Sequence, residues 1–304
     1  MNGVINQVVT EKYALYNGDS TEILKNFTDD SIGFSVYSVP FLSLYCYSNS
    51  ERDLGNCRTP EEFYEHLGFI VAELFRTTKP GRISACHCMN IPAMKERDGY
   101  IGLKDFRGDL IRLFQKHGWI FHSEHCIWKD PLIEATRTKA LGLMHKQLCK
   151  DSSMARAGIP DYLLAFRKPG GNEEFINHPD GLTEFHGEDE PRVGVLSHER
   201  WRRYASPVWM DCRMTNTLQY MSARESEDEK HICPLSLDVS RRAVQLWSNP
   251  GDIVLTPFMG IGSEVYSAVE LGRMGVGIEL KESYFNQAVK NIKTLDAPKQ
   301  YELF

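Results

Sequence analysis

The segment from residue 250 to residue 292 limits the folds open to this 304-residue chain more than any other part of it. An apolar run at residues 252–255 has the composition of a short strand and stops at a proline and a glycine-rich turn. A stretch with helical spacing follows, and a second apolar run at 276–278 ends on Glu279. An acidic side chain about 20 residues beyond such a turn can accept hydrogen bonds from ribose hydroxyls. This succession of strand, loop, helix and strand predicts a nucleoside-binding unit.

Two glycines of the turn, Gly260 and Gly262, have a mechanical role in this prediction. Without a Cβ atom they let the polar backbone of a ligand approach the main chain, and we expect a side chain at Gly262 to fill the ligand's space. A dinucleotide site would have a third glycine at position 265, where this chain has the branched Val265. The pattern therefore disfavours NAD. A tight turn without a ligand is the alternative, and the presence of Glu279 at this spacing disfavours that alternative.

The size and charge of the chain exclude several classes of protein. At 304 residues it can bury the core of one large α/β domain with an insertion, or two smaller cores, and we expect one main domain. A net charge of −6 argues against a basic protein that coats nucleic acid without regard to sequence, so a DNA site has to be a local patch. The sequence lacks an N-terminal signal and an apolar run of about 18 residues, which predicts a cytoplasmic protein without membrane contact.

The eight cysteines are predicted to be reduced thiols of the core. They form no CxxC pairs at zinc-binding spacing, and the cluster Cys86-His87-Cys88 has no matching second pair. We therefore predict no metal site.

Apolar runs alternate with segments of helical spacing from residue 13 to residue 166, which predicts a doubly wound, mostly parallel α/β sheet. Predicted strands lie at residues 13–16, 32–37, 82–89, 119–128 and 162–166, and predicted helices at 23–27, 60–78 and 109–117. Functional residues of such sheets collect at the carboxyl ends of strands. Asp19 follows the first of these strands in a turn, and Ser38, Val39, Pro40 and Phe41 follow the second.

Two short runs resemble the motifs of one enzyme family, the S-adenosylmethionine-dependent DNA amino-methyltransferases. The run TPFMGIGS at residues 256–263 is similar to the family's cofactor loop, an acidic residue followed by PFxGxGT or PFxGxGS. The run SVPF at residues 38–41 is similar to its catalytic motif, an Asp, Asn or Ser followed by two prolines and an aromatic residue. Thr256 and Val39 depart from these forms. The order of the motifs, with the catalytic motif first and the cofactor loop late, resembles the beta group of the family.

The resemblance implies a seven-stranded Rossmann-like sheet with an inserted recognition region, S-adenosyl-L-methionine as the cofactor and double-stranded DNA as the partner. In this family a His and a Pro ahead of the helix before the glycine loop line the methionine end of the cofactor, which implies this role for His231 and Pro234. The implied cofactor contacts are Asp19, His231, Pro234, Thr256, Pro257, Phe258, Gly260, Gly262, Ser263 and Glu279.

The catalytic motif has a chemical reason. The lone pair of an exocyclic amino group on adenine or cytosine is delocalised into the ring, so the nitrogen is a poor nucleophile until acceptors hold its hydrogens. By resemblance, Ser38 and the backbone carbonyl of Val39 are these acceptors, and Phe41 offers a face to a base flipped out of the duplex. Transfer to cytosine C5 would need a cysteine after a proline, and the chain has no Pro-Cys dipeptide. We therefore predict direct methyl transfer to an amino nitrogen.

Two features point to different bases. A serine at the start of the motif, here Ser38, is frequent in enzymes that modify cytosine N4, whereas adenine enzymes form the larger share of the group. We favour adenine N6, with cytosine N4 as the first alternative. A methyltransferase acting on RNA or a small amine and a non-catalytic DNA-binding relative are further alternatives. The sequence leaves open a restriction partner, a phage role and a homodimer.

DNA contacts are predicted in the middle of the chain. Residues 129–160, between two strands of a predicted hairpin, are locally basic, and Lys139, Lys146 and Arg156 are candidate phosphate contacts. Residues 199–204 interleave basic and aromatic side chains, which makes Arg202 a fourth candidate. Solvated or core-packing helices are the alternatives for both segments. Residues 42–60 are predicted to form a loop that closes over the bound base.

The predicted organisation is a permuted one. The ranges are 1–128 for the catalytic half, 129–160 for the basic DNA-contacting insertion, 161–169 for a closing strand, 170–230 for a linker with a target-recognition region, and 231–304 for the cofactor-binding half.

Overall fold

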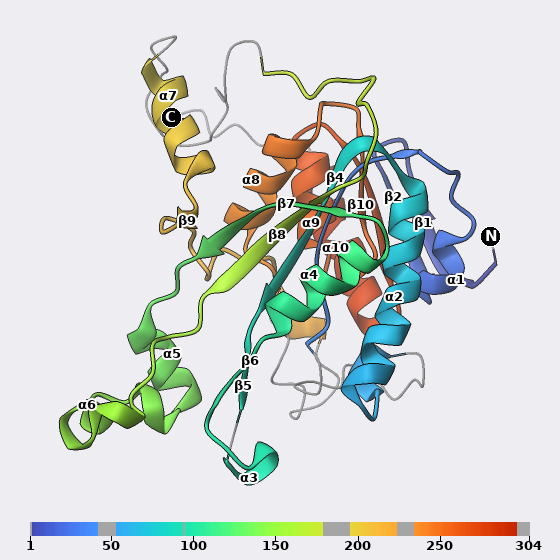
Figure 1. Cartoon of the computed structure of the whole chain (residues 1–304). Coiled ribbons are helices and arrows are strands. Elements are labelled where there is room, and N and C mark those ends of the chain that lie inside the picture. The colour runs from blue at the N-terminus through green and yellow to red at the C-terminus, as the bar shows by residue number, and fades with distance from the viewer. Residues whose placement is uncertain (1, 42–52, 94, 179–194, 224–233, 297–304) are drawn as a thin grey trace.

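The computed structural model describes residues 2–41, 53–93, 95–178, 195–223 and 234–296. Within these residues the centre of the molecule is a nine-stranded sheet in the order β1-β2-β11-β10-β3-β4-β8-β7-β9 (Figure 1). Its strands are β1 (Val4–Val9), β2 (Tyr13–Gly18), β3 (Ile32–Ser38), β4 (Thr78–Met89), β7 (Ile120–Ile127), β8 (Asp161–Arg167), β9 (Val208–Trp209), β10 (Ile253–Thr256) and β11 (Met274–Glu279).

The five strands β2-β11-β10-β3-β4 run parallel. β8 is antiparallel to both of its neighbours, β4 and β7, and β9 adds a parallel edge to β7. These findings confirm the predicted mostly parallel α/β sheet and its seven strands, and they add β1 and β9 at the edges. β1 was not predicted because most of its side chains are exposed on an edge strand, so no apolar run marks it. β9 was not predicted because it is only two residues long.

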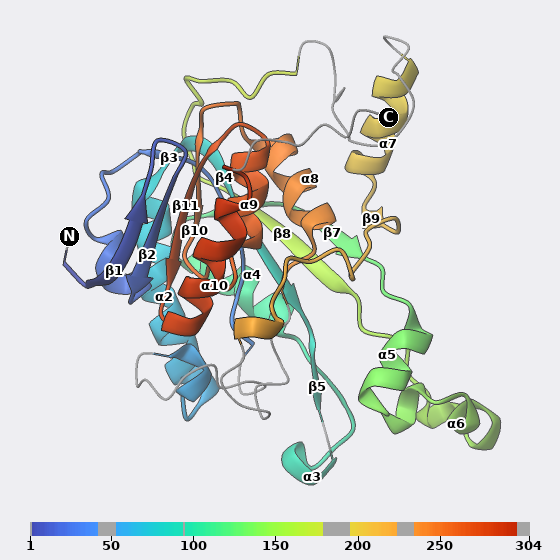
Figure 2. The same cartoon turned by 180° about the vertical axis from the view of Figure 1, so that it is seen from behind.

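Helices cover both faces of the sheet, as a doubly wound fold requires (Figures 1 and 2). On one face lie α1 (Ser20–Leu24), α2 (Pro60–Thr77) and α4 (Phe106–Lys116), and on the other α8 (Leu237–Trp247), α9 (Ser263–Glu270) and α10 (Glu282–Lys293). Because successive side chains of a strand point to opposite faces, Val36 and Tyr37 of β3 belong to two different cores. The hydroxyl of Thr59 accepts the N–H of Glu62, which caps the start of α2.

The strand order places the two halves of the chain against each other. β10, from the C-terminal part, pairs with β3, from the N-terminal part, through Val254 opposite Phe34 and Leu255 opposite Ser35. From this seam α9 leads to β11 over one face, and α2 leads from β3 towards β4 over the other face. Such a change of direction opens a crevice at the carboxyl ends of the two central strands.

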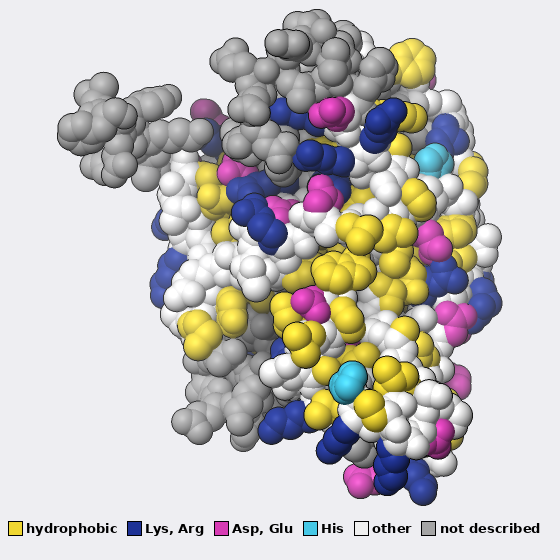
Figure 3. All heavy atoms as spheres, turned by 90° about the vertical axis from the view of Figure 1, so that its left-hand side faces the viewer, with side chains coloured by type: hydrophobic (Ala, Val, Ile, Leu, Met, Phe, Trp, Pro, Cys, Tyr) yellow, Lys and Arg dark blue, Asp and Glu magenta, His cyan; other side chains and the backbone are white. Residues whose placement is uncertain are grey.

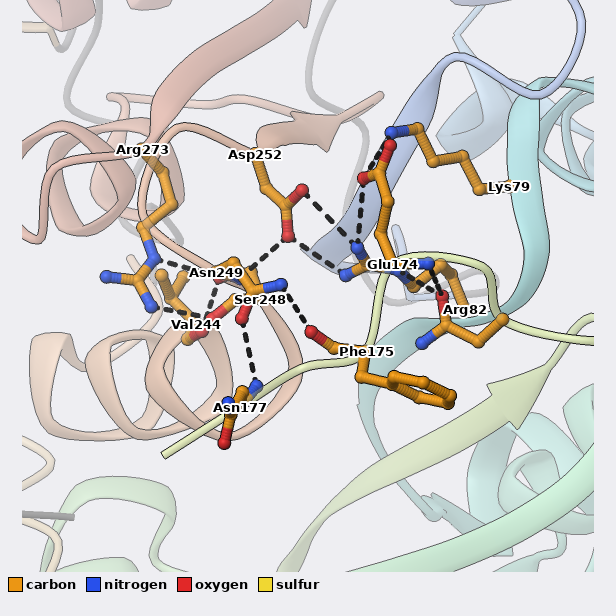
Figure 4. Close-up of polar contacts among 11 residues, drawn as sticks. Lys79, Arg82, Glu174, Phe175, Asn177, Val244, Ser248, Asn249, Asp252 and Arg273 are labelled. Carbon is orange, nitrogen blue, oxygen red and sulfur yellow. Dashed lines mark hydrogen bonds and ion pairs between the residues drawn. The ribbon is translucent and has the colours of Figure 1, made fainter. Parts of the chain in front are cut away.

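A polar cluster at the opposite end of the sheet ties the halves together (Figure 4). The fully buried Arg82 of β4 donates from Nη1 to Oδ2 of Asp252, just before β10, at 2.9 Å. The segment after β8 packs here, because Asn172 accepts from Arg82 Nε at 3.1 Å and Asn249 Nδ2 donates to the Phe175 carbonyl at 2.8 Å. This cluster therefore joins β4, β10 and the chain that leaves β8.

The insertion between β7 and β8 forms α5 (Pro131–Thr138) and α6 (His145–Lys150), which project from the body on the crevice side (Figures 1 and 2). The small hairpin of β5 (Ile91–Ala93) and β6 (Gly102–Lys104), with α3 (Lys95–Asp98), was not predicted. α7 (Val195–Ala205) lies at the other end of the molecule (Figures 1 and 2). No helix in the described residues has the length and apolar character needed to cross a membrane.

Candidate active site

A cavity of about 1090 Å³ opens at the carboxyl ends of β3, β10 and β11. The sheet order creates it, because the β3–β10 seam brings the N-terminal motif beside the glycine loop. The predicted residues that line the cavity are Asp19, Ser38, Val39, Pro40, Phe41, Pro234, Pro257, Phe258, Gly260, Ser263 and Glu279. Two motifs that lie far apart in the sequence therefore share one site.

Two predicted cofactor residues, Thr256 and Gly262, do not lie on this wall, and a third cannot be placed. His231 is outside the described residues. Thr256 is 1% exposed, and its hydroxyl has no hydrogen-bond partner among the described residues. Gly262 has a φ of 92°, and a Cβ there would lie 3.0 Å from Cδ1 of Ile292 and 3.2 Å from Cβ of Ala288 on α10. The expectation that a side chain at Gly262 fills the ligand's space is therefore wrong, because the glycine is needed for the turn and for the approach of α10.

Gly260, unlike Gly262, faces open space. It lines the cavity, and a Cβ built on it would meet no atom within 4 Å. Its φ of 53° lies in the left-handed region, and its N–H donates to Oε2 of Glu279 at 2.8 Å. The main chain of the loop is therefore open to a ligand at this position.

The bulky Val265 is accommodated by glycines of the neighbouring strand. A Cβ on Gly275 would lie 2.6 Å from Cγ1 of Val265, and one on Gly277 would lie 2.3 Å from the sulfur of Met259. In a dinucleotide fold, the third glycine of the loop permits this close contact between helix and strand. Here β11 provides the space instead, so the loop tolerates a branched residue.

Glu279 ends β11 with its carboxyl group held by the backbone. Oε1 accepts the N–H of Lys281 and Oε2 accepts the N–H of Gly260, both at 2.8 Å. Burial raises the pKa of this carboxyl to about 7, with the nearby Asp53 adding to the rise and the two N–H groups opposing it. The carboxyl oxygens keep lone pairs for further donors, as hydroxyl groups of a sugar would supply. Asp53 also lines the cavity and was not predicted.

Ser38 contacts a chain of polar groups that spans three adjacent strands. Its Oγ lies 2.8 Å from Nδ1 of His87, its partner in the β3–β4 register. Nε2 of His87 lies 3.3 Å from Oδ2 of Asp161 on β8, outside ideal hydrogen-bond geometry. Lys129 Nζ donates to Oδ1 of the same carboxylate at 2.6 Å. Burial acts to raise the pKa of Asp161, but the contacts with His87 and Lys129 outweigh it and hold the pKa below its ordinary value.

Glu264, in the first turn of α9, is a second buried carboxyl of the cavity wall. It is 4% exposed. Burial raises its pKa to about 8 and the charge of Glu279 adds to this, while the backbone N–H groups of Glu264 and Ser38 oppose the rise. The group is therefore mostly protonated at neutral pH and lies beside the catalytic motif.

His87, Asp161 and Glu264 were missed as site residues. The cluster Cys86-His87-Cys88 was considered only as a metal site, and no group of His, Cys, Asp and Glu in the described chain could hold a metal ion. The position of His87 near the end of a predicted strand was a usable signal. Of the cysteines that the structure describes, Cys86, Cys88 and Cys212 are buried but Cys149 is exposed, so not all are core thiols.

The predicted DNA contacts do not form one group. Lys139 and Lys146 are exposed on the insertion, at the crevice side of the sheet. Arg156 instead pairs with Glu134 at 3.2 Å inside the insertion, which weakens its candidacy as a phosphate contact. Arg202 is exposed on α7, at the opposite end of the molecule (Figures 1 and 2).

The surface on the left-hand side of Figure 1 agrees with the separation between the basic residues of the insertion and those of α7 (Figure 3). Lys and Arg side chains gather at its lower end, at the level of α5 and α6, and again near its upper end (Figure 3). Mainly hydrophobic side chains lie between the two groups (Figure 3). Exposed apolar residues of the insertion include Leu132 and Ile133, with 73% and 64% of their surface accessible. Of the two basic segments, the insertion therefore lies on the side of the cavity, whereas α7 lies at the other end of the molecule.

Known proteins share both the sequence pattern and the fold. A family model for DNA methylases of the N6/N4 type matches residues 45–290. The Type II methyltransferase M.BglI of Bacillus subtilis is 23% identical over 327 aligned residues, which cover 95% of this chain and 88% of that protein. The Type II methyltransferase M.MjaI of Methanocaldococcus jannaschii is 24% identical over 212 residues, which cover 69% of this chain and only 61% of that protein.

The fold is similar to that of a protein from Thermus thermophilus, named as a candidate DNA modification methylase and solved in complex with S-adenosyl-L-methionine. The TM-score is 0.67 at 21% identity, and the match covers 92% of this chain and 93% of that one.

Proposed function

This chain belongs to the N6/N4 DNA methylase family, whose enzymes transfer a methyl group from S-adenosyl-L-methionine to an exocyclic amino group of a DNA base, and we propose that it modifies N6 of adenine in double-stranded DNA. The observation that carries the proposal is the single cavity that joins the glycine loop and Glu279 to Ser38. Its volume of about 1090 Å³ is at the upper end for small-molecule sites, which supports room for a cofactor together with a purine.

The residues of the cofactor side fit S-adenosyl-L-methionine. Gly260 leaves the main chain open, and Glu279 presents a carboxyl group for ribose hydroxyls. The buried hydroxyl of Ser263 lines the same cavity and has no partner among the described residues, so it is available to a polar group of the ligand. Bound there, the cofactor supplies an electrophilic methyl group.

The residues of the base side fit an amino acceptor. Ser38 and the carbonyl of Val39 hold the hydrogens of the amino group, so that its lone pair becomes available for the methyl group. Phe41 lines the cavity and offers a face to the flipped base. Methyl transfer is then a direct displacement at the methyl carbon, without a covalent intermediate on the protein.

Val39 replaces the first proline of the motif without loosening the turn. Its N–H donates to the carbonyl of His87 at 3.2 Å, a bond that a proline could not make. Its side chain is 1% exposed and packs in the core. A tertiary hydrogen bond and buried packing thus replace the rigidity of a ring, which supports an active rather than a decayed motif.

The insertion is proposed to hold the DNA backbone. Lys139 and Lys146 are exposed on the insertion, and cations there can neutralise phosphates of the DNA backbone. The two relatives described above are Type II methyltransferases, which supports a role as the modification partner of a restriction enzyme.

The test is to incubate the purified protein with labelled S-adenosyl-L-methionine and unmethylated duplex DNA, and to identify the product nucleoside by mass spectrometry. N6-methyladenine is expected, and Ser38→Ala should lower its rate of formation about 10- to 1000-fold. N4-methylcytosine, which the serine of the motif favours, would overturn the choice of base. 5-Methylcytosine would overturn direct transfer to an amino group, and label confined to RNA or small amines would overturn the DNA substrate.

A further inference from the structure

A serine hydroxyl is an ambiguous acceptor, which makes the surroundings of Ser38 informative. Its oxygen can accept a hydrogen bond from the amino group of the base only if its own proton points elsewhere. Aspartate, another residue of the family at this place, has no such proton when ionised. A serine in this position therefore needs a neighbour that takes its proton and holds it away from the base.

The neighbour is His87. Nδ1 lies 2.8 Å from Ser38 Oγ, and the residue is only 7% exposed, so water competes little for this contact. On the other side of the ring, Nε2 faces the buried carboxylate of Asp161 at 3.3 Å. A negative charge beside Nε2 favours a proton on that nitrogen and leaves Nδ1 as the acceptor. Lys129, at 2.6 Å from Asp161, keeps the carboxylate in place.

We propose that His87, oriented by Asp161, is a positioning residue that makes Ser38 an obligate acceptor and carries away the proton released by methyl transfer. The proposal rests on the proposed function, because it assigns a path for the proton of that reaction. It extends the site from the four-residue motif that begins at the last residue of β3 to side chains of β4 and β8.

The proton and electron balance of the step is simple. The lone pair of the amino nitrogen forms the new bond to the methyl carbon, and the pair of the broken carbon–sulfur bond stays on sulfur. The cationic nitrogen then loses one N–H proton to Ser38 Oγ and keeps the electron pair of that bond. The original hydroxyl proton moves to Nδ1 of His87, giving an imidazolium that Asp161 stabilises and that returns its proton to water.

Another pair of side chains on the same strands shows what a purely structural contact looks like. The hydroxyl of Tyr37 on β3 lies 3.2 Å from the hydroxyl of Ser84 on β4. Both residues are buried, and neither lines the cavity. Ser84→Ala therefore removes a hydrogen bond between the same two strands without touching the site, and it is the matched control.

The kinetic test is a double-mutant cycle between Ser38 and His87, with methyl transfer to duplex DNA measured at saturating cofactor. His87→Leu should lower kcat about 10- to 100-fold without changing the Kd of S-adenosyl-L-methionine. His87→Asn, which keeps an amide near the position of Nδ1, should recover part of the rate. In the Ser38→Ala background His87→Leu should have no further effect, because the relay acts only through the hydroxyl. Ser84→Ala should leave kcat unchanged.

Multiplicative effects of Ser38→Ala and His87→Leu would overturn the relay. A second measurement does not depend on methyltransferase activity. Nitrogen NMR of the wild-type protein, with the His87 signal assigned from His87→Asn, should show the neutral tautomer with the proton on Nε2. A proton on Nδ1 instead would also overturn the proposal. If the wild-type protein methylated no DNA, the proposed function would fail and the relay with it, whereas DNA methylation together with a proton on Nδ1 would overturn the relay alone.

Discussion

Asp252→Asn should lower the free energy of unfolding by about 3 kcal/mol, because it leaves the Arg82 guanidinium buried without its main counter-charge. Arg82 is 0% exposed at its side chain and Asp252 only 8%, so water cannot replace the lost charge. Asparagine keeps the size of the side chain, which matters because a Cβ on Gly33 would already lie 2.8 Å from Cγ of Asp252. The change in the free energy of unfolding therefore measures the loss of the negative charge and not a change in side-chain size. Glu174, at 3.5 Å and 60% exposed, compensates only in part, which places the loss at the low end of the range for broken buried pairs.

Urea unfolding followed by circular dichroism measures this loss, and the same cluster provides the control (Figure 4). Glu174→Gln removes an exposed charge from the same guanidinium and should change the free energy of unfolding by less than about 1 kcal/mol. Arg82→Met in the Asp252→Asn background should restore much of the stability, because it removes the charge that is left unpaired. Equal losses for Asp252→Asn and Glu174→Gln, or no rescue by Arg82→Met, would refute the idea that burial of this charge sets the stability of the seam.

Three further predictions concern the cavity and the insertion. Burial raises the pKa of Glu264 from 4.5 to about 8, so the stability contributed by its neutral form is fully present below pH 4.5 and is lost as the pH rises through 8. Because of this group, the wild-type free energy of unfolding should fall by about 3 kcal/mol between pH 6 and pH 9. Glu264→Gln, which resembles the neutral acid, should make this fall smaller. Parallel pH curves for the two proteins would contradict the prediction. Gly262→Ala should lower the melting temperature through its contact with α10, whereas Gly260→Ala should act mainly on cofactor affinity in calorimetry, and the reverse ranking would contradict the assignment of the two glycines. Neutralising Lys139 and Lys146 should lower the salt dependence of DNA binding by about one unit of slope for each, and an unchanged slope would move the DNA surface elsewhere.

The sequence alone was sufficient for the parts of the site that depend on neighbours along the chain. A strand, a glycine turn, a helix and a second strand form one local unit, so the spacing from Gly260 to Glu279 already placed the acid beside the loop. Ser38 was found because it directly follows a predicted strand and because residues 38–41 resemble a family motif. The mostly parallel sheet also followed from local patterns, since buried strands and amphipathic helices each leave a period in the sequence.

Tertiary structure decided everything that depends on which strands are neighbours. The pairing of β3 with β4 and of β4 with β8 brings His87 and Asp161 to Ser38, and no sequence period encodes that order. Burial likewise set the raised pKa of Glu264, because desolvation depends on atoms from several distant segments. Composition made Arg156 and Arg202 look alike, but an ion pair with Glu134 engages the first, and the path of the chain carries the second to the far end of the molecule. Local patterns specify elements, whereas contacts between distant residues arise only when those elements pack.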